Sequence, residues 1–111
     1  MVISAYCFMP DHMHLLVAGD SPTANFRRFV SRAKQLSGHW WSRAFGGRLW
    51  QRYGWDRVLR SEEDTCEVIR YILANPVRAG LVPRPLAYPF SGSLLYERDA
   101  LIDAFGDDHL P

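Results

Sequence analysis

The sequence has only two cysteines, no long hydrophobic run and a central stretch without any acidic residue. Cys7 and Cys66 lie far apart and make no disulfide framework, so we expect two buried free thiols. No apolar run approaches the roughly 18 residues of a membrane helix, and no charged-then-apolar leader opens the chain. These absences argue against membrane-spanning and disulfide-stabilised secreted proteins, and we expect a cytoplasmic protein.

The charge is segregated along the chain, although the net charge is only +1. The stretch 21–55 carries seven of the thirteen basic residues and none of the twelve acidic ones. The same stretch is rich in aromatic residues, most of which we expect in the core. Lys and Arg release counterions from nucleic acid, and rings can stack on bases. We therefore expect DNA binding, with a merely solvated basic face as the alternative. The candidate DNA-binding residues are Arg27, Arg28, Arg32, Lys34, Arg48, Arg52 and Arg57.

The 111 residues, 48% of them hydrophobic, suffice for one globular domain with a modest core. Val2 to Phe8 and His12 to Ala18 have the composition of strands, and Met9-Pro10-Asp11 between them predicts a hairpin turn. Ser21 as an N-cap with proline next predicts a helix over about 22–45, closed by two glycines. Residues 49–59 predict a strand with a bend at a central glycine.

A second helix is predicted over 61–75, because a serine cap and three acidic residues open it. Pro76 is expected to stop this helix. The proline-rich segment 83–90 is expected to be irregular, 94–105 to form a short helix, and 106–111 to be an acidic tail. These elements predict an α+β fold.

Two histidines with one apolar residue between them stand at the start of the second strand. Residues two apart on a strand point to the same face, so His12 and His14 should aim at one point, with Met13 facing the other way into a core. Neutral imidazole is a common metal ligand. A lone His-x-His is more often incidental than functional, so a second element is needed.

That second element is on the helix predicted over 61–75. Tyr71 and Asn75 are four residues apart and share a face. The amide oxygen of Asn75 could bind a metal, and the hydroxyl of Tyr71 could attack a phosphorus atom. Taken alone, this spacing favours a structural role.

Taken together, these passages resemble the single-tyrosine HUH transposases, where HUH denotes His, a hydrophobic residue and His. Within them the sequence is similar to the REP-associated tyrosine transposases. The resemblance covers about residues 2–83, and its most specific parts are Ala5-Tyr6-Cys7-Phe8-Met9-Pro10-Asp11-His12-Met13-His14-Leu15-Leu16-Val17 and Arg70-Tyr71-Ile72-Leu73-Ala74-Asn75-Pro76-Val77-Arg78-Ala79-Gly80-Leu81-Val82.

The resemblance implies a ferredoxin-like or RRM-like antiparallel sheet with helices packed on it. It implies a divalent metal, Mg²⁺ or Mn²⁺, bound by His12, His14 and Asn75, with Tyr71 as the nucleophile. The enzyme would cleave and rejoin single-stranded hairpin DNA through a 5′-phosphotyrosine, at the nucleoid in the cytoplasm. A homodimer stays open, as do two other functions: a non-catalytic nucleic-acid-binding remnant, and a metal phosphodiesterase that uses water.

The resemblance also implies a strand and a helix before the strand that contains Tyr6, and the sequence lacks them. The missing strand would lie beside the strand of His12 and His14 and leave an exposed sheet edge. A late start codon, a decayed gene copy and pairing with another chain are the alternative explanations. We expect a catalytic domain over residues 1–90, followed by a short helix and tail over 91–111.

Overall fold

The computed structural model describes residues 1–51, 54, 59 and 62–105. The chain divides into two compact units. The sheet unit consists of Val2–Ala18 and Leu59–Pro111, and the helical unit consists of Met1 and Gly19–Val58. In the described part of the chain, no helix is long and apolar enough to cross a membrane.

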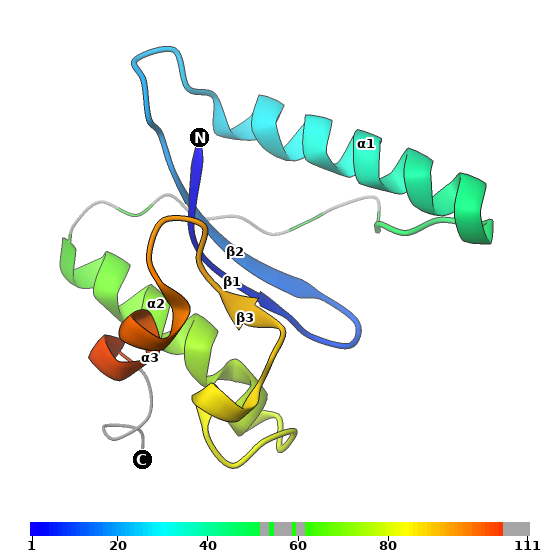
Figure 1. Ribbon diagram of the computed structural model, residues 1–111. Helices are drawn as coiled ribbons and strands as arrows, with labels where there is room; N and C mark the ends of the chain where they lie inside the picture. Colours follow the sequence, from blue (N-terminus) through cyan, green and yellow to red (C-terminus); the bar gives the residue numbers. More distant parts are fainter. Residues whose placement is uncertain (52–53, 55–58, 60–61, 106–111) are drawn as a thin grey trace. The chain divides into compact units, whose positions relative to one another are not determined.

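The sheet unit is built on an antiparallel hairpin (Figure 1). Strand β1 (Val2–Phe8) pairs with β2 (Met13–Ala18) on one side and with the short β3 (Ser91–Gly92) on the other, so the order is β2-β1-β3. The amide of Met9 donates to the carbonyl of His12 at 2.8 Å and closes the predicted turn. The prediction of an α+β fold with an antiparallel sheet is confirmed.

The core of the sheet unit lies on the face of β1 that carries Ala5 and Cys7, both fully buried. Helix α2 packs on this face, because its apolar side needs a partner to be removed from water. The residues that α2 and the C-terminal segment add to the core are Ile69, Ile72, Leu73, Tyr88, Leu101 and Ile102.

The expected orientation of Met13 was wrong. Cys7 pairs with His14 across the hairpin, and Phe8 pairs with Met13. Directly opposed residues share a face, so His14 lies on the core side of the sheet and Met13 on the opposite side with the half-exposed Phe8. The alternation along the strand was predicted correctly, but the packing of α2 decided which face is buried.

Helix α2 spans Glu62–Arg78 and includes Pro76. The prediction that Pro76 stops this helix was therefore wrong. Proline in a helix interior removes one hydrogen bond. The helix nevertheless continues, because Pro76 is fully buried and the amide of Ala79 still donates to the carbonyl of Asn75 at 3.0 Å. It ends at Gly80 with φ 76°, in a Schellman arrangement in which the amide of Leu81 donates to the carbonyl of Pro76.

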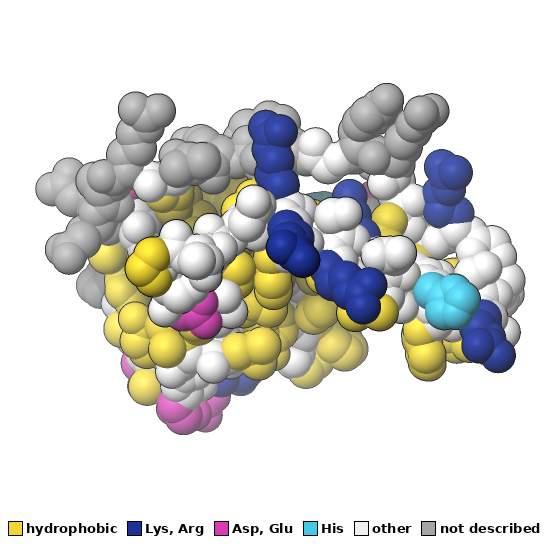
Figure 2. All heavy atoms as spheres, turned by 90° about the horizontal axis from the view of Figure 1, so that it is seen from above, with side chains coloured by type: hydrophobic (Ala, Val, Ile, Leu, Met, Phe, Trp, Pro, Cys, Tyr) yellow, Lys and Arg dark blue, Asp and Glu magenta, His cyan; other side chains and the backbone are white. Residues whose placement is uncertain are grey.

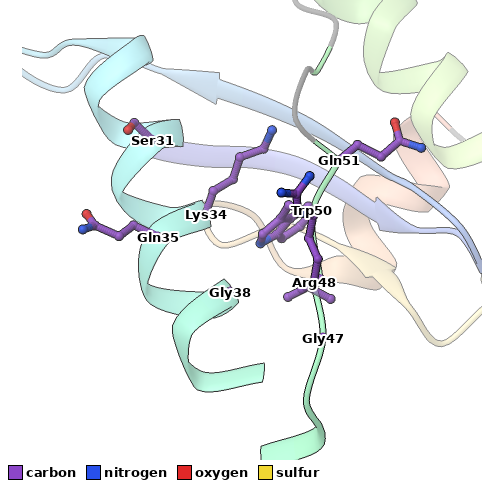
Figure 3. A pocket seen from close by; sticks show the side chains of 9 residues that line it. Ser31, Lys34, Gln35, Gly38, Gly47, Arg48, Trp50 and Gln51 are labelled. Atoms are coloured by element: carbon purple, nitrogen blue, oxygen red, sulfur yellow. The ribbon is translucent and has the colours of Figure 1, made fainter. Parts of the chain in front are cut away.

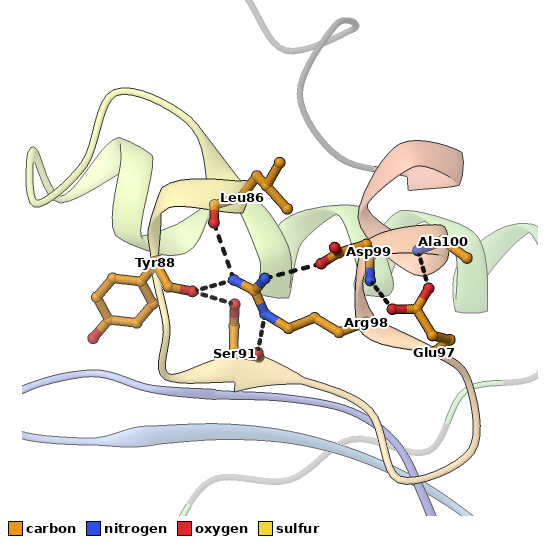
Figure 4. Close-up of polar contacts among 7 residues, drawn as sticks. All are labelled: Leu86, Tyr88, Ser91, Glu97, Arg98, Asp99 and Ala100. Carbon is orange, nitrogen blue, oxygen red and sulfur yellow. Dashed lines mark hydrogen bonds and ion pairs between the residues drawn. The ribbon is translucent and has the colours of Figure 1, made fainter.

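The segment after α2 is more ordered than the irregular chain predicted over 83–90. It contains a 3₁₀ turn (Pro85–Ala87), then β3, and ends in α3 (Arg98–Phe105), which is shorter than the helix predicted over 94–105. Arg98 holds these pieces together by donating to the carbonyls of Ser91, Tyr88 and Leu86 at 3.0, 2.6 and 3.2 Å (Figure 4). Residues 91–105 therefore share the core that β1 and α2 form.

The helical unit is dominated by α1 (Phe26–Phe45). The predicted start near residue 22 was wrong, because Asn25 caps the helix by accepting from the amide of Arg28 at 3.0 Å. Gly46, with φ 77°, ends the helix as predicted. No residue of α1 is buried, and Trp40 and Phe45 are more than 60% exposed, so the expectation that most of these rings lie in the core was wrong.

The chain after α1 runs back beside the helix. The indole N–H of Trp50 donates to the hydroxyl of Ser37 at 2.8 Å. Residues 49–51, 54 and 59 are not in a strand, which contradicts the strand predicted there in the part that is described. Trp50 instead packs against α1, where its ring lies beside Gly38.

Candidate active site

Two histidine rings meet at the beginning of β2. The ring centroids of His12 and His14 are 4.9 Å apart and nearly perpendicular. His12 is the last residue of the hairpin turn, and its side chain is 51% exposed, whereas His14 is half-buried on the core side of the sheet. The predicted convergence of the two imidazoles is therefore present in the structure.

The ring of Tyr71, on α2, lies beside this pair. Its centroid is 5.8 Å from that of His14, at an interplanar angle of 84°. Tyr71 is 53% exposed. The packing of α2 on the sheet thus brings the candidate nucleophile next to the candidate metal ligands, from positions 57 residues apart in the chain, while its side chain stays accessible to a substrate.

Asn75 is one helical turn beyond Tyr71 on the same side of α2. Its Nδ2 atom is buried and has no hydrogen-bond partner among the residues described. An unsatisfied buried amide costs about 1–3 kcal/mol, and such groups are expected mainly where function requires them. Nδ2 is a donor, so only an acceptor would satisfy it, whereas Oδ1 of the same amide is the atom that could bind a metal.

Arg78 is a site residue that the sequence interpretation missed. Its guanidinium carbon lies 4.1 Å from the centroid of the Tyr71 ring, and its Nη2 donates to the Tyr71 carbonyl at 2.7 Å. The signal was present, because residues seven apart lie on one side of a helix after two turns.

The electrostatics of the site keep His14 neutral. Burial, then the neighbouring His12, then the positive charge of Arg78 lower the pKa of His14 below its ordinary value of 6.5. Asp11 accepts a 2.6 Å hydrogen bond from Nδ1 of His12, and this bond lowers the pKa of the Asp11 carboxyl. With Nδ1 so occupied, Nε2 of His12 is the ring nitrogen left for a ligand.

The residues present fit a metal ion. A ring nitrogen about 2.1 Å from an ion places two imidazole centroids roughly 4.6–5.3 Å apart at bond angles near 90–110°, and the observed separation is 4.9 Å. Within the described residues, no cluster of three or more His, Cys, Asp and Glu side chains could hold a metal. A third protein ligand beside His12 and His14 would therefore have to be of another type, and the amide oxygen of Asn75 is a ligand of that kind.

The candidate DNA-binding residues that the structure describes belong to the helical unit. Arg27, Arg28, Arg32 and Arg48 are exposed and Lys34 is half-buried, and Figure 2 shows several Lys and Arg side chains on the face in view. Arg52 and Arg57 lie outside the described residues.

A groove of about 500 Å³ runs between α1 and the residues that follow it (Figure 3). Lys34 reaches into it from the helix, and its Nζ is 5.9 Å from the centroid of the Trp50 ring. Arg48 and Gln51 also line it. The described residues that line the groove offer cations and an indole ring but no acidic side chain, which suits a polyanion.

Comparison with known proteins decides the family. A sequence model of the family described as "Transposase IS200 like" matches residues 1–74. The chain belongs to the IS200-like transposase family. The resemblance inferred from the sequence motifs is thereby confirmed, and the α+β sheet of the sheet unit is consistent with this membership.

Two relatives narrow the comparison. The chain is 26% identical to a Haemophilus influenzae protein provisionally named a REP-associated tyrosine transposase, over 94% of this chain and 64% of the relative. It is 29% identical to the REP-associated tyrosine transposase of Escherichia coli K12, over 80% of this chain and 52% of the relative. The chain thus spans between half and two thirds of these relatives. No solved structure matches it.

Proposed function

We propose that this IS200-like transposase cleaves and rejoins single-stranded DNA through a covalent bond to Tyr71. The observation that supports the proposal most directly is the contact of the accessible Tyr71 ring with His14, which in turn contacts His12. A nucleophile beside two imidazole nitrogen ligands is an arrangement suited to metal-assisted phosphoryl transfer. The names of both relatives agree with a tyrosine transposase.

In the proposed reaction, the Tyr71 hydroxyl loses its proton and its oxygen attacks the phosphorus of a phosphodiester. The bond from phosphorus to the 3′-oxygen breaks, and this oxygen takes up a proton. The products are a 5′-phosphotyrosine and a free 3′-hydroxyl. The number of phosphoester bonds is unchanged, so attack by a 3′-hydroxyl on the phosphotyrosine can join strands by the reverse reaction.

His12, His14 and Asn75 would hold Mg²⁺ or Mn²⁺, which would act as a Lewis acid on the phosphate oxygens. Two imidazoles favour Mn²⁺, because Mg²⁺ prefers oxygen ligands and retained water. The lowered pKa of His14 keeps this ligand unprotonated at neutral pH. The hydrogen bond from His12 to Asp11 orients the first imidazole for the same task.

The helical unit would bind the DNA substrate. Its exposed arginines, with Lys34, supply charge for the backbone, and the groove beside Trp50 supplies an aromatic surface. Arg52 and Arg57 belong to the same proposal on sequence grounds. We propose folded palindromic repeats, presented as single-stranded hairpins, as the substrate.

The test is denaturing gel electrophoresis after the protein is mixed with Mn²⁺ and hairpin DNA from beside its own gene. Wild type should give a slow-migrating covalent species, and Tyr71→Phe should give none. Replacement of His12 and His14 by Ala should also abolish the species. The Phe variant keeps the ring contact with His14, so it is the matched control for folding.

The other outcomes separate the alternative functions. DNA binding without cleavage or adduct in wild type would identify a non-catalytic nucleic-acid-binding protein. Cleavage without adduct, equal in wild type and Tyr71→Phe, would show that water is the nucleophile. Either result would overturn the tyrosine mechanism.

A further inference from the structure

Arg78 holds a position at the site that its role in the fold does not explain. It lies at the end of α2, and its guanidinium stacks on Tyr71 with a distance of 4.1 Å from the guanidinium carbon to the ring centroid. Among the described residues, one of its five N–H donors has a partner, through the bond from Nη2 to the Tyr71 carbonyl. The residue is exposed, so most of its hydrogen-bonding capacity faces solvent beside the candidate nucleophile.

A second feature is the electrostatic environment of Arg78. Among the residues described, no carboxylate forms an ion pair with it, although Arg98 and the amino terminus each have such a partner. A cation near a helix C-terminus is favourable in itself, but that effect does not require stacking on a tyrosine.

The ligand that this arrangement suits is a phosphate. The planar guanidinium fork matches phosphate oxygens, and hydrogen bonds between charged partners are the strong ones. Phosphoryl transfer spreads negative charge over the non-bridging oxygens, and catalysis depends on donors fixed where that charge lies. The contact with the Tyr71 ring fixes the Arg78 side chain, so its free donors are held close to any phosphate that Tyr71 can reach.

We infer that Arg78 is a further catalytic residue, which binds a non-bridging oxygen of the phosphate that Tyr71 attacks. This inference rests on the proposed function. Arg78 forms and breaks no covalent bond. It neutralises charge on the phosphate while the bond from Tyr71 forms and the bond to the 3′-oxygen breaks.

The experiment measures the single-turnover rate of adduct formation at saturating hairpin DNA with Mn²⁺. Arg78→Ala should lower this rate by about 10²- to 10³-fold, the range found when one donor to a developing charge is removed. Arg78→Lys keeps the charge without the fork and should recover part of the loss. Arg84→Ala is the matched control, because Arg84 is exposed and its side chain does not cap the 3₁₀ turn that follows it. Its rate should stay within about twofold of wild type.

A methylphosphonate at the cleavage site distinguishes a phosphate contact from a structural role of Arg78, because a structural defect should be equally large on both substrates. This group is neutral, so a lost phosphate contact should matter less, and the Arg78→Ala defect should shrink by at least about tenfold relative to the phosphodiester. A defect of equal size on both substrates, or a rate like that of Arg84→Ala, would overturn the inference while leaving the tyrosine mechanism intact. Absence of an adduct in wild type would refute the proposed function, and this inference with it.

Discussion

Replacement of Asn75 by Ala tests whether this residue is a metal ligand or has only a structural role. The Nδ2 atom of Asn75 is buried without a partner in the described part of the chain, and such a group costs about 1–3 kcal/mol. Its removal returns part of that cost. Alanine also favours the helix over asparagine by about 0.5 kcal/mol, while the loss of packing is limited because Asn75 is only half-buried. We expect the free energy of unfolding to stay constant or rise by up to about 2 kcal/mol.

In the presence of metal, the same substitution should lower the free energy of unfolding relative to wild type. Mn²⁺ at 100 times its dissociation constant should raise the free energy of unfolding of wild type by about 2.7 kcal/mol, because only the folded state binds it. Asn75→Ala should lose most of this gain at the same Mn²⁺ concentration, since one ligand is gone. The variant would therefore be at least as stable as wild type without metal and less stable with it.

Urea unfolding followed by circular dichroism, with and without Mn²⁺, measures both quantities. Leu73→Ala is the contrasting control: Leu73 is fully buried in the core, so truncation should cost about 2–5 kcal/mol while the metal-dependent gain persists. If the free energy of unfolding of metal-free Asn75→Ala falls by more than about 2 kcal/mol, Asn75 is a satisfied structural amide and not a ligand. Equal stabilisation of the variant and of wild type by Mn²⁺ would also contradict the ligand role.

Three further predictions concern the fold, the pH dependence and the DNA interface. Tyr88→Phe removes the bond from its hydroxyl to the Phe8 carbonyl and should cost about 1–3 kcal/mol in urea unfolding; an unchanged midpoint would contradict this. Since the pKa of His14 is lowered on folding, the unfolded chain binds a proton more tightly, so metal-free stability should fall as the pH drops from about 6.5 to the folded pKa and then level off. The variant His14→Gln should show a smaller fall in stability over this pH range. Identical pH profiles for wild type and this variant would contradict the role of His14. Replacement of Arg27, Arg28 and Arg32 by Ala should weaken DNA binding and reduce the salt slope by up to about 2, at roughly 0.7 per phosphate contact on single strands; binding that does not depend on salt would exclude this interface.

Local patterns in the sequence were sufficient for the features that depend on near neighbours. The hairpin around Met9-Pro10-Asp11 and the end of α1 at Gly46 are set by turn chemistry. The convergence of His12 and His14 follows from their spacing. The family also followed from short motifs, because each places several chemically specific residues at fixed distances.

Local patterns were misleading where packing outweighed propensity. Pro76 is unfavourable inside a helix, but burial of the last turn of α2 against the core offsets the lost hydrogen bond. The two-residue β3 is too short to show an alternating pattern. It forms because the segment after α2 is tied down by Arg98 and by the bond from Tyr88 to Phe8.

The sequence by itself determined the chemical types of the site residues and the family to which the chain belongs, because these depend on side-chain identity and spacing over a few residues. Only the tertiary structure decided which face of the hairpin carries the core, and hence that His14 meets Tyr71. That contact joins two elements far apart in the chain. It depends on the packing of α2 against β1 and β2, which no local pattern encodes.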